Sequence, residues 1–317
     1  MKLITAFLRL VRWQNLLMIF VTQVLYYFCF IQPILSELED AYSSFTTRYF
    51  LLQMLASLLI AAAGNIINDY FDLNIDEINK PAKKIIDKLI KRRWAIVQHI
   101  LLSLTGILIG FYIDFKTPVF WLGFTNLACV LLLFGYSISL KKKLLAGNIL
   151  ISALTAWIIL VCFFCYYRSF SCTGCEFFEW QGVIRRFIRI SILYAGFAFV
   201  ISLIREVVKD MEDMDGDAKY GCKTIPIAWG IPASKVFVAV WLVVLIGMIG
   251  VVQFYVLQFG WRWSAAYSIV LLVAPLVWIL LQLRKANVAA DYHRLSAAIK
   301  FVMFAGILSM LFFRIYS

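Results

Sequence analysis

The chain has 317 residues, of which 63% are hydrophobic and only 15% charged, and its formal net charge is +12. A soluble domain is nearer half apolar and a quarter charged, so this composition excludes an ordinary soluble protein and indicates an integral membrane protein. The basic residues lie in short segments between apolar runs, which is typical of membrane topology and argues against binding to nucleic acid.

Nine apolar segments are long enough to cross a bilayer, so the predicted fold class is all-α, a polytopic membrane protein. The segments are about 14–32, 49–68, 95–114, 118–140, 145–167, 187–206, 234–257, 264–283 and 296–315. No soluble domain interrupts them, and we expect one membrane domain over residues 1–317. The first segment has no small-residue cleavage site after it, so we expect it to stay in the protein.

Two long connections, 69–94 and 207–233, follow the second and the sixth segment. That spacing of four helices predicts a parallel pseudo-repeat, about 1–140 and 141–285, with a ninth helix at 296–315. Most Lys and Arg residues fall on the side of the N-terminus and of both long connections. By the positive-inside rule this side is cytoplasmic, the C-terminus is outside, and the predicted location is the cell (inner) membrane.

Each long connection begins with the pattern D-x-x-D-x-x-x-D. The first copy is Asp69, Asp72 and Asp76, and the second is Asp210, Asp213 and Asp217. On a continuous helix at about 100° per residue, each set falls within an arc of roughly 60°. The first arc also takes in Asn65, with Asn68 on its edge. We therefore expect two carboxylate-bearing faces on the same side of the membrane.

Three carboxylates on one face repel one another unless a cation lies among them. Mg²⁺ takes hard oxygen ligands, usually one or two carboxylates per ion, and completes its shell with water and substrate phosphates. The paired clusters therefore predict a metal-bridged diphosphate site, with Arg205 and Lys209 able to contact phosphate oxygens. A solvated acidic loop is the alternative for either cluster alone. A calcium loop is excluded, because Glu77 and Ala218 stand where such loops require glycine.

A diphosphate site in a membrane suits a substrate with a long apolar tail, and the matching reaction is ionisation of an allylic prenyl diphosphate. Aromatic faces stabilise such a cation, and an apolar cavity excludes the water that would quench it. Candidate aromatic residues are Trp13, Tyr70, Phe71 and Tyr136, although packing or an interfacial belt also explains each of them. Cys172 and Cys175 form a C-x-x-C in a polar loop, which we expect to be an incidental pair rather than a disulfide or zinc site.

At these motifs the chain resembles the UbiA superfamily of intramembrane prenyltransferases. The family pattern N-D-x-x-D-x-x-x-D begins here at Asn68, and the second pattern begins at Asp210. The match also includes Gly64-Asn65, Asn79-x-Pro81, Tyr136-Ser137 followed by Lys141, Gly147-Asn148, and Arg205-Glu206-x-x-Lys209-Asp210 through Gly216-Asp217.

The resemblance implies a helical bundle around a central cavity, with Mg²⁺ ions that bridge both motifs to the diphosphate. Carried over by position, the metal and diphosphate set is Asn68, Asp72, Asp76, Asp213 and Asp217, with Asp69 and Asp210 as supporting acids. Tyr136 is similar to a tyrosine near the reacting carbon. The expected substrate-binding residues are Asn65, Asn68, Lys141, Arg205 and Lys209.

The second motif, followed by Thr224-Ile-Pro226, is most similar to the geranylgeranylglycerol-phosphate geranylgeranyltransferase branch. That branch implies geranylgeranyl diphosphate as donor and a glycerol-phosphate ether lipid as acceptor. A 4-hydroxybenzoate or naphthoate acceptor is the alternative within the family, because segment 82–87 lacks the prolines and glycine that often follow the first motif. A cation-coupled transporter is the alternative of another class, but charges near the middle of the segments are nearly absent. Beyond these substrates and membrane lipids we expect no protein partner.

Overall fold

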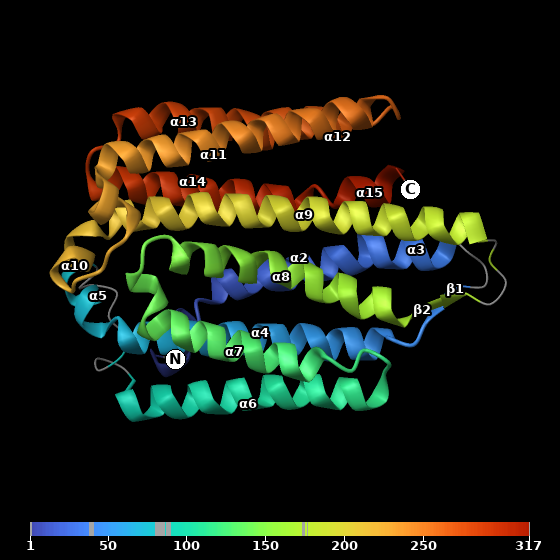
Figure 1. Cartoon of the computed structure of the whole chain (residues 1–317), viewed down its shortest axis with the longest axis horizontal. Helices are drawn as coiled ribbons and strands as arrows, with labels where there is room; N and C mark the ends of the chain where they lie inside the picture. The colour runs from blue at the N-terminus through green and yellow to red at the C-terminus, as the bar shows by residue number, and fades with distance from the viewer. Residues whose placement is uncertain are drawn as a thin grey trace.

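The computed structural model describes residues 2–37, 41–79, 86, 90–172, 175 and 177–316. Long helices lie side by side along one direction and form a bundle (Figure 1). The helices of the first part are α1 (Lys2–Leu10), α2 (Trp13–Tyr26), a π-helical turn (Tyr27–Ile31), α3 (Gln32–Glu37), α4 (Thr47–Phe71), α5 (Leu73–Asn79), α6 (Arg92–Lys116) and α7 (Leu122–Ile138). A 3₁₀ turn (Leu140–Lys142) follows α7.

The later helices are α8 (Ala146–Ser169), α9 (Phe177–Glu212), α10 (Met214–Lys219), α11 (Ile225–Leu257), α12 (Arg262–Ser268), a second π-helical turn (Ile269–Val273), α13 (Ala274–Lys285), α14 (Ala289–Leu308) and α15 (Leu311–Tyr316). Two short strands, β1 (Ala41–Ser43) and β2 (Phe170–Cys172), pair antiparallel.

All nine predicted segments are helical. In the part of the chain that the structure describes, eight helical stretches are long and apolar enough to cross a membrane. The fourth predicted segment is the exception, because α7 has only 17 residues. The sixth helix is longer than predicted, since α9 begins at Phe177. Its extension carries Arg186, which forms an ion pair with Glu37.

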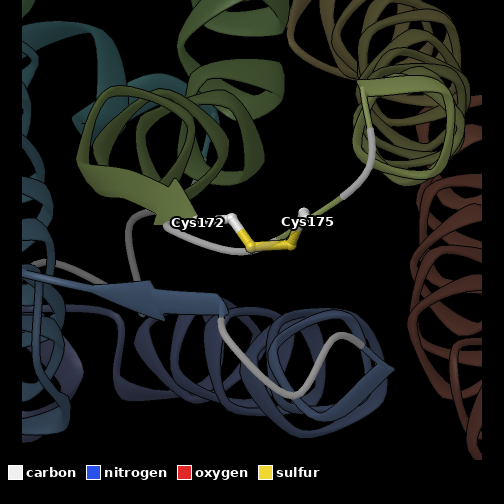
Figure 2. The surroundings of a disulfide bond; sticks show 2 residues. All are labelled: Cys172 and Cys175. Atoms are coloured by element: carbon white, nitrogen blue, oxygen red, sulfur yellow. A yellow bond between two sulfur atoms is a disulfide. The ribbon is translucent and has the colours of Figure 1, made fainter.

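The two ends of the bundle differ. The N-terminus, α5 and α10 lie at one end, and β1, β2 and the C-terminus lie at the other (Figure 1). At the strand end Cys172 and Cys175 form a disulfide (Figure 2). The expectation of an incidental pair was therefore wrong. Cys172 is the last residue of β2 and pairs with Ala41 of β1. The Cα atoms of Cys172 and Cys175 are 5.7 Å apart, within the usual range for a disulfide.

Two large apolar clusters hold the bundle together. One is rich in aromatic residues and gathers around Tyr26, Phe45, Tyr166 and Phe187. The other packs α9 against α11, α13 and α14 through aliphatic side chains such as Ile204, Leu242, Leu276, Ile279 and Ile299. Such all-round apolar helices are expected in a bilayer, where every backbone polar group must be satisfied within the helix.

Candidate active site

A cavity of about 1330 Å³ is lined by residues of α2, α4, α7, α8, α9, α11 and α14. Its lining includes Asp72 and Asp213 at the α5–α10 end of the bundle, and Trp261 and Phe313 from its opposite half. Most small-molecule pockets measure about 300–1,000 Å³, so this cavity is large enough for more than a compact ligand. Its acidic residues gather at one end, as the sequence predicted.

Both aspartate motifs contain a helix break at their middle aspartate. Helix α4 ends at Phe71, and Asp72 has φ −88° and ψ 0° before α5 begins. Helix α9 ends at Glu212, and Asp213 has φ −97° and ψ 6° before α10 begins. The expectation of one continuous helical face per motif was therefore wrong. These angles belong to the bridge region, which many active-site residues adopt.

The break at Asp72 is accompanied by two contacts to its carboxylate. Asn68 Nδ2 donates to Oδ2 at 2.8 Å, and the Lys141 ammonium forms an ion pair with Oδ1. Lys141 comes from the turn after α7, where Gly147 makes a close approach possible: a Cβ on Gly147 would lie 2.9 Å from the Lys141 Cα. The structure thus joins the first motif to Lys141, a predicted substrate-binding residue.

Asp69 points to a different partner, Arg12, which lies in the turn between α1 and α2. Arg12 Nη2 donates to Asp69 Oδ1 at 2.6 Å, and the Asp69 charge raises the pKa of Arg12 further, so the guanidinium stays charged. Asn65 Nδ2 donates to the Val11 carbonyl at 2.9 Å. Asn65 lines the cavity, but its amide holds the turn that presents Arg12.

The second motif has its own polar surroundings. Asn148 Nδ2 on α8 donates to Asp210 Oδ2 at 2.8 Å. Four residues earlier, Glu206 accepts from Arg205 at 3.1 Å and from Lys209 at 3.4 Å. The cavity is lined by four of these side chains: Arg205, Glu206, Lys209 and Asp210. Lys209 and Arg205 therefore present positive charge to the cavity beside the acids.

Asn79, the last residue of α5, connects the two motifs directly. Its Nδ2 donates to the Asp213 carbonyl at 3.0 Å, and its Oδ1 accepts from the Gly216 amide at 2.9 Å. A Cβ on Gly216 would lie 2.3 Å from Asn79 Oδ1, so only glycine permits this approach. We call Asn79, the Asp213 carbonyl and Gly216 the motif latch. It holds segments 134 and 137 residues apart side by side.

The donor set fits a hard cation. Asn68 Oδ1 is buried and has no hydrogen-bond partner, and it lies beside the Asp72 carboxylate that Asn68 Nδ2 contacts. Asp213 and Asp217 line the same cavity. Among the described side chains, no three of His, Cys, Asp and Glu converge on one point. This arrangement suits Mg²⁺, which needs few carboxylates and takes the rest of its shell from water and phosphates.

The structure therefore brings together most of the predicted site. Eleven of the predicted site residues line one cavity: Asn65, Asn68, Asp69, Asp72, Tyr136, Lys141, Arg205, Lys209, Asp210, Asp213 and Asp217. Asp76 lies on α5, but its side chain is outside the described part. The same holds for segment 82–87 apart from Ile86. Tyr136 is close enough to Asp72 and Asp210 for their charges to act on its hydroxyl.

Sequence reasoning missed several cavity residues. Arg12 was treated only as a topology charge, although its position just before the first span was a usable signal. Lys300 and His293, which both lie on α14, were also missed. Cys222 lies at the same end, 4% exposed; burial raises the pKa of its thiol, so the thiol stays neutral.

Comparison with known proteins agrees with this geometry. The model of the UbiA prenyltransferase family matches residues 39–308. The chain belongs to this family. It is therefore a prenyltransferase, and the family assignment argues against the cation-coupled transporter.

Two similar proteins of the family carry the same name. The digeranylgeranylglyceryl phosphate synthase of Methanothermobacter thermautotrophicus is 34% identical over 260 residues, which are 80% of this chain and 82% of that protein. The synthase of the same name from Methanospirillum hungatei is 33% identical over 258 residues, 80% of this chain and 82% of that protein.

Solved structures share the fold. A structure described as giving insights into digeranylgeranylglyceryl phosphate synthase in membranes has a TM-score of 0.61 at 22% identity, and the match covers 98% of this chain and 99% of that one. A UbiA homologue from Archaeoglobus fulgidus bound to DMAPP and Mg²⁺ has a TM-score of 0.57 at 15% identity, covering 95% and 99%. At these identities the likeness shows the UbiA fold.

Proposed function

We propose that this UbiA-family protein transfers a geranylgeranyl group from geranylgeranyl diphosphate to a glycerol-phosphate ether lipid, with Mg²⁺ as cofactor. The names of the relatives from Methanothermobacter and Methanospirillum support the acceptor. The Archaeoglobus homologue, bound to DMAPP and Mg²⁺ in one structure and to GPP and Mg²⁺ in another, supports the donor class and the metal.

The observation that carries the proposal is the latch between the two motifs. Because Asn79 contacts both the Asp213 carbonyl and the Gly216 amide, the two aspartate-bearing helix ends stand at one end of one cavity. A single diphosphate group can then be held from both sides.

In this scheme the metal would be held by Asn68, Asp72, Asp76, Asp213 and Asp217. Bound there, Mg²⁺ would neutralise the charge of the leaving diphosphate. Lys141 and Lys209 line the same cavity and supply further positive charge to phosphate oxygens. Asp69 pairs with Arg12, and Asp210 accepts a hydrogen bond from Asn148. These two acids therefore support the site rather than act as direct metal ligands.

The bond changes follow from the donor chemistry. The allylic C–O bond breaks, and its electron pair leaves with the diphosphate. An oxygen lone pair of the acceptor hydroxyl forms the new C–O bond, and the hydroxyl proton is lost to the released diphosphate or a nearby carboxylate. The Tyr136 ring, which lines the same cavity as Asp72, would stabilise the allylic cation. The apolar remainder of the cavity excludes competing water.

We infer further that the protein lies in the cell membrane and that the end of the bundle with the two aspartate motifs faces the cytoplasm. The N-terminus, α5 and α10 lie at this end (Figure 1), and in the sequence most Lys and Arg residues fall on the side of the N-terminus and of the two motif-bearing connections. The disulfide lies at the opposite end, and disulfides persist in oxidising compartments. Two independent features thus support one orientation, with the C-terminus outside.

The proposal is tested with purified protein, Mg²⁺ and geranylgeranyl diphosphate, offered either geranylgeranylglyceryl phosphate or 4-hydroxybenzoate. Mass spectrometry identifies the product. We expect the double ether lipid with the first acceptor and no prenylated product with the second. Prenylated 4-hydroxybenzoate as the main product would replace the lipid acceptor by the aromatic one.

A further inference from the structure

Besides Lys141, which pairs with Asp72, a further group of basic side chains lines the cavity. Its members come from three places along the chain. They are Arg12 in the α1–α2 turn, Arg205 and Lys209 on α9, and Lys300 on α14. The ammonium of Lys300 lies within electrostatic reach of the other three. We call these four residues the basic cluster.

Lys300 reaches the cavity from a polar stripe on α14. His293, Ser296 and Lys300 are spaced i, i+3 and i+7, which places them on one helix face, and all three line the cavity. Lys300 Nζ donates to Gln14 Oε1 on α2 at 3.3 Å, while His293 is paired with Glu212. Lys300 has no carboxylate partner among the ion pairs of the described residues.

Within the cluster, Lys300 differs from the other three cations, because each of those has a carboxylate partner. Asp69 pairs with Arg12, and Glu206 lies between Arg205 and Lys209. The charges of Asp72 and Asp210 also act on Arg12 and Lys209. In addition, Arg205 Nε is buried without a hydrogen-bond partner. Like charges gathered in a cavity are stabilised by an anion. A phosphate monoester, with about −1.5 to −2 charges at pH 7 and three acceptor oxygens, can accept from both the Lys300 ammonium and Arg205 Nε.

The reaction proposed above needs two anionic head groups in one cavity. The donor diphosphate belongs with the aspartates, Lys141 and the metal. We propose that Lys300, with Arg205, forms a second anion subsite that binds the phosphate of the glycerol-phosphate acceptor and selects for it. This inference rests on the proposed function, because it gives that acceptor its binding residues. It separates the two phosphates by placing the donor diphosphate between the two aspartate motifs beside Lys141, and the acceptor phosphate against Lys300 on α14 and Arg205 on α9.

The first test measures binding of the acceptor alone, without donor or Mg²⁺. Calorimetry in detergent compares geranylgeranylglyceryl phosphate with the corresponding alcohol, geranylgeranylglycerol. We expect the wild type to bind the phosphate form at least about tenfold more tightly, as charge-assisted hydrogen bonds of this kind allow. Lys300→Gln should remove most of that preference, and Lys300→Arg should keep most of it. Asp72→Asn should leave the preference intact, because Asp72 belongs to the donor side.

The second test separates acceptor from donor in steady-state kinetics. Lys300→Gln should raise the acceptor KM about tenfold and leave the donor KM within twofold. The matched control is Lys285→Gln, which removes an exposed charge at the end of α13 outside the cavity. It should change neither constant. A melting temperature for each variant checks that the bundle is folded.

The outcomes distinguish this inference from the proposed function. If the wild type makes the double ether lipid but Lys300→Gln keeps the acceptor KM and the phosphate preference, the subsite assignment is wrong and the function stands. A raised donor KM instead would place Lys300 on the diphosphate and also overturn the assignment. If the wild type itself shows no preference for the phosphate form, the glycerol-phosphate acceptor fails together with its subsite.

Discussion

The motif latch makes a specific prediction about Gly216. Replacement of Gly216 by alanine would place a Cβ 2.3 Å from Asn79 Oδ1 and 2.5 Å from its Nδ2. The Asn79 side chain must then move away and lose both of its hydrogen bonds to the second motif. Helix propensity alone would favour alanine over glycine by about 1 kcal/mol, so a loss of function cannot come from the helix itself.

The expected magnitude follows from those two bonds. At about 1 kcal/mol each, they contribute about 2 kcal/mol to the alignment of the two motifs. With about 1.4 kcal/mol per factor of ten, kcat/KM should fall roughly 30-fold in Gly216→Ala. Asn79→Ala removes the same hydrogen bonds without a clash, and its kcat/KM should fall by a similar factor. Because both changes break one contact, the double variant should be no worse than either single variant.

The assay is diphosphate release from geranylgeranyl diphosphate with saturating acceptor and Mg²⁺, alongside a thermal melt in detergent. Gly196→Ala is the matched control, since nothing lies within 4 Å of a Cβ at that position of α9. It should keep wild-type activity. Activity of Gly216→Ala and Asn79→Ala within twofold of wild type, or additive losses in the double variant, would refute the role of the latch.

Three further predictions concern the metal set, the donor contact and the orientation. Asp72→Ala should abolish diphosphate release while leaving expression intact. The control is Asp215→Asn, at an exposed acid of α10, which should release diphosphate at nearly the wild-type rate. Full activity of Asp72→Ala would exclude the metal site. Lys141→Met should raise the donor KM about tenfold, through loss of a charge-assisted contact, in a fit of rate against donor concentration; an unchanged donor KM would remove Lys141 from the donor site. After reduction, Cys172 and Cys175 should react with an impermeant maleimide on intact cells; labelling only after permeabilisation would reverse the proposed orientation.

The sequence predicted the helical class, the apolar segments and the end of the bundle that holds the acids, because these depend on composition and local spacing. It did not predict the helix break at Asp72. No glycine or proline marks that position. The break coincides instead with contacts of the Asp72 carboxylate to Asn68 and to Lys141, and the lysine lies 69 residues away in the chain.

Other features were hidden for the same reason. Asn79 belongs to the Asn79-x-Pro81 pattern, but its hydrogen-bond partners, Asp213 and Gly216, lie in the other half of the chain. The pairing of β1 with β2, which ends at Cys172 next to the disulfide, joins segments about 130 residues apart and has no local signature. Arg12 and Lys300 are single charges near the ends of apolar segments. Such charges usually serve topology, and only the folded bundle shows that both face the cavity.

The central claim is that the two aspartate motifs form one donor site. The most direct measurement is the affinity for geranylgeranyl diphosphate with Mg²⁺ in Asp72→Ala, Asp213→Ala and the double variant. If one site spans both motifs, each single variant should lose nearly as much affinity as the double variant, because either change removes the shared diphosphate-bound metal. Losses in free energy that simply add, or a variant of either aspartate that binds the donor as the wild type does, would contradict the account.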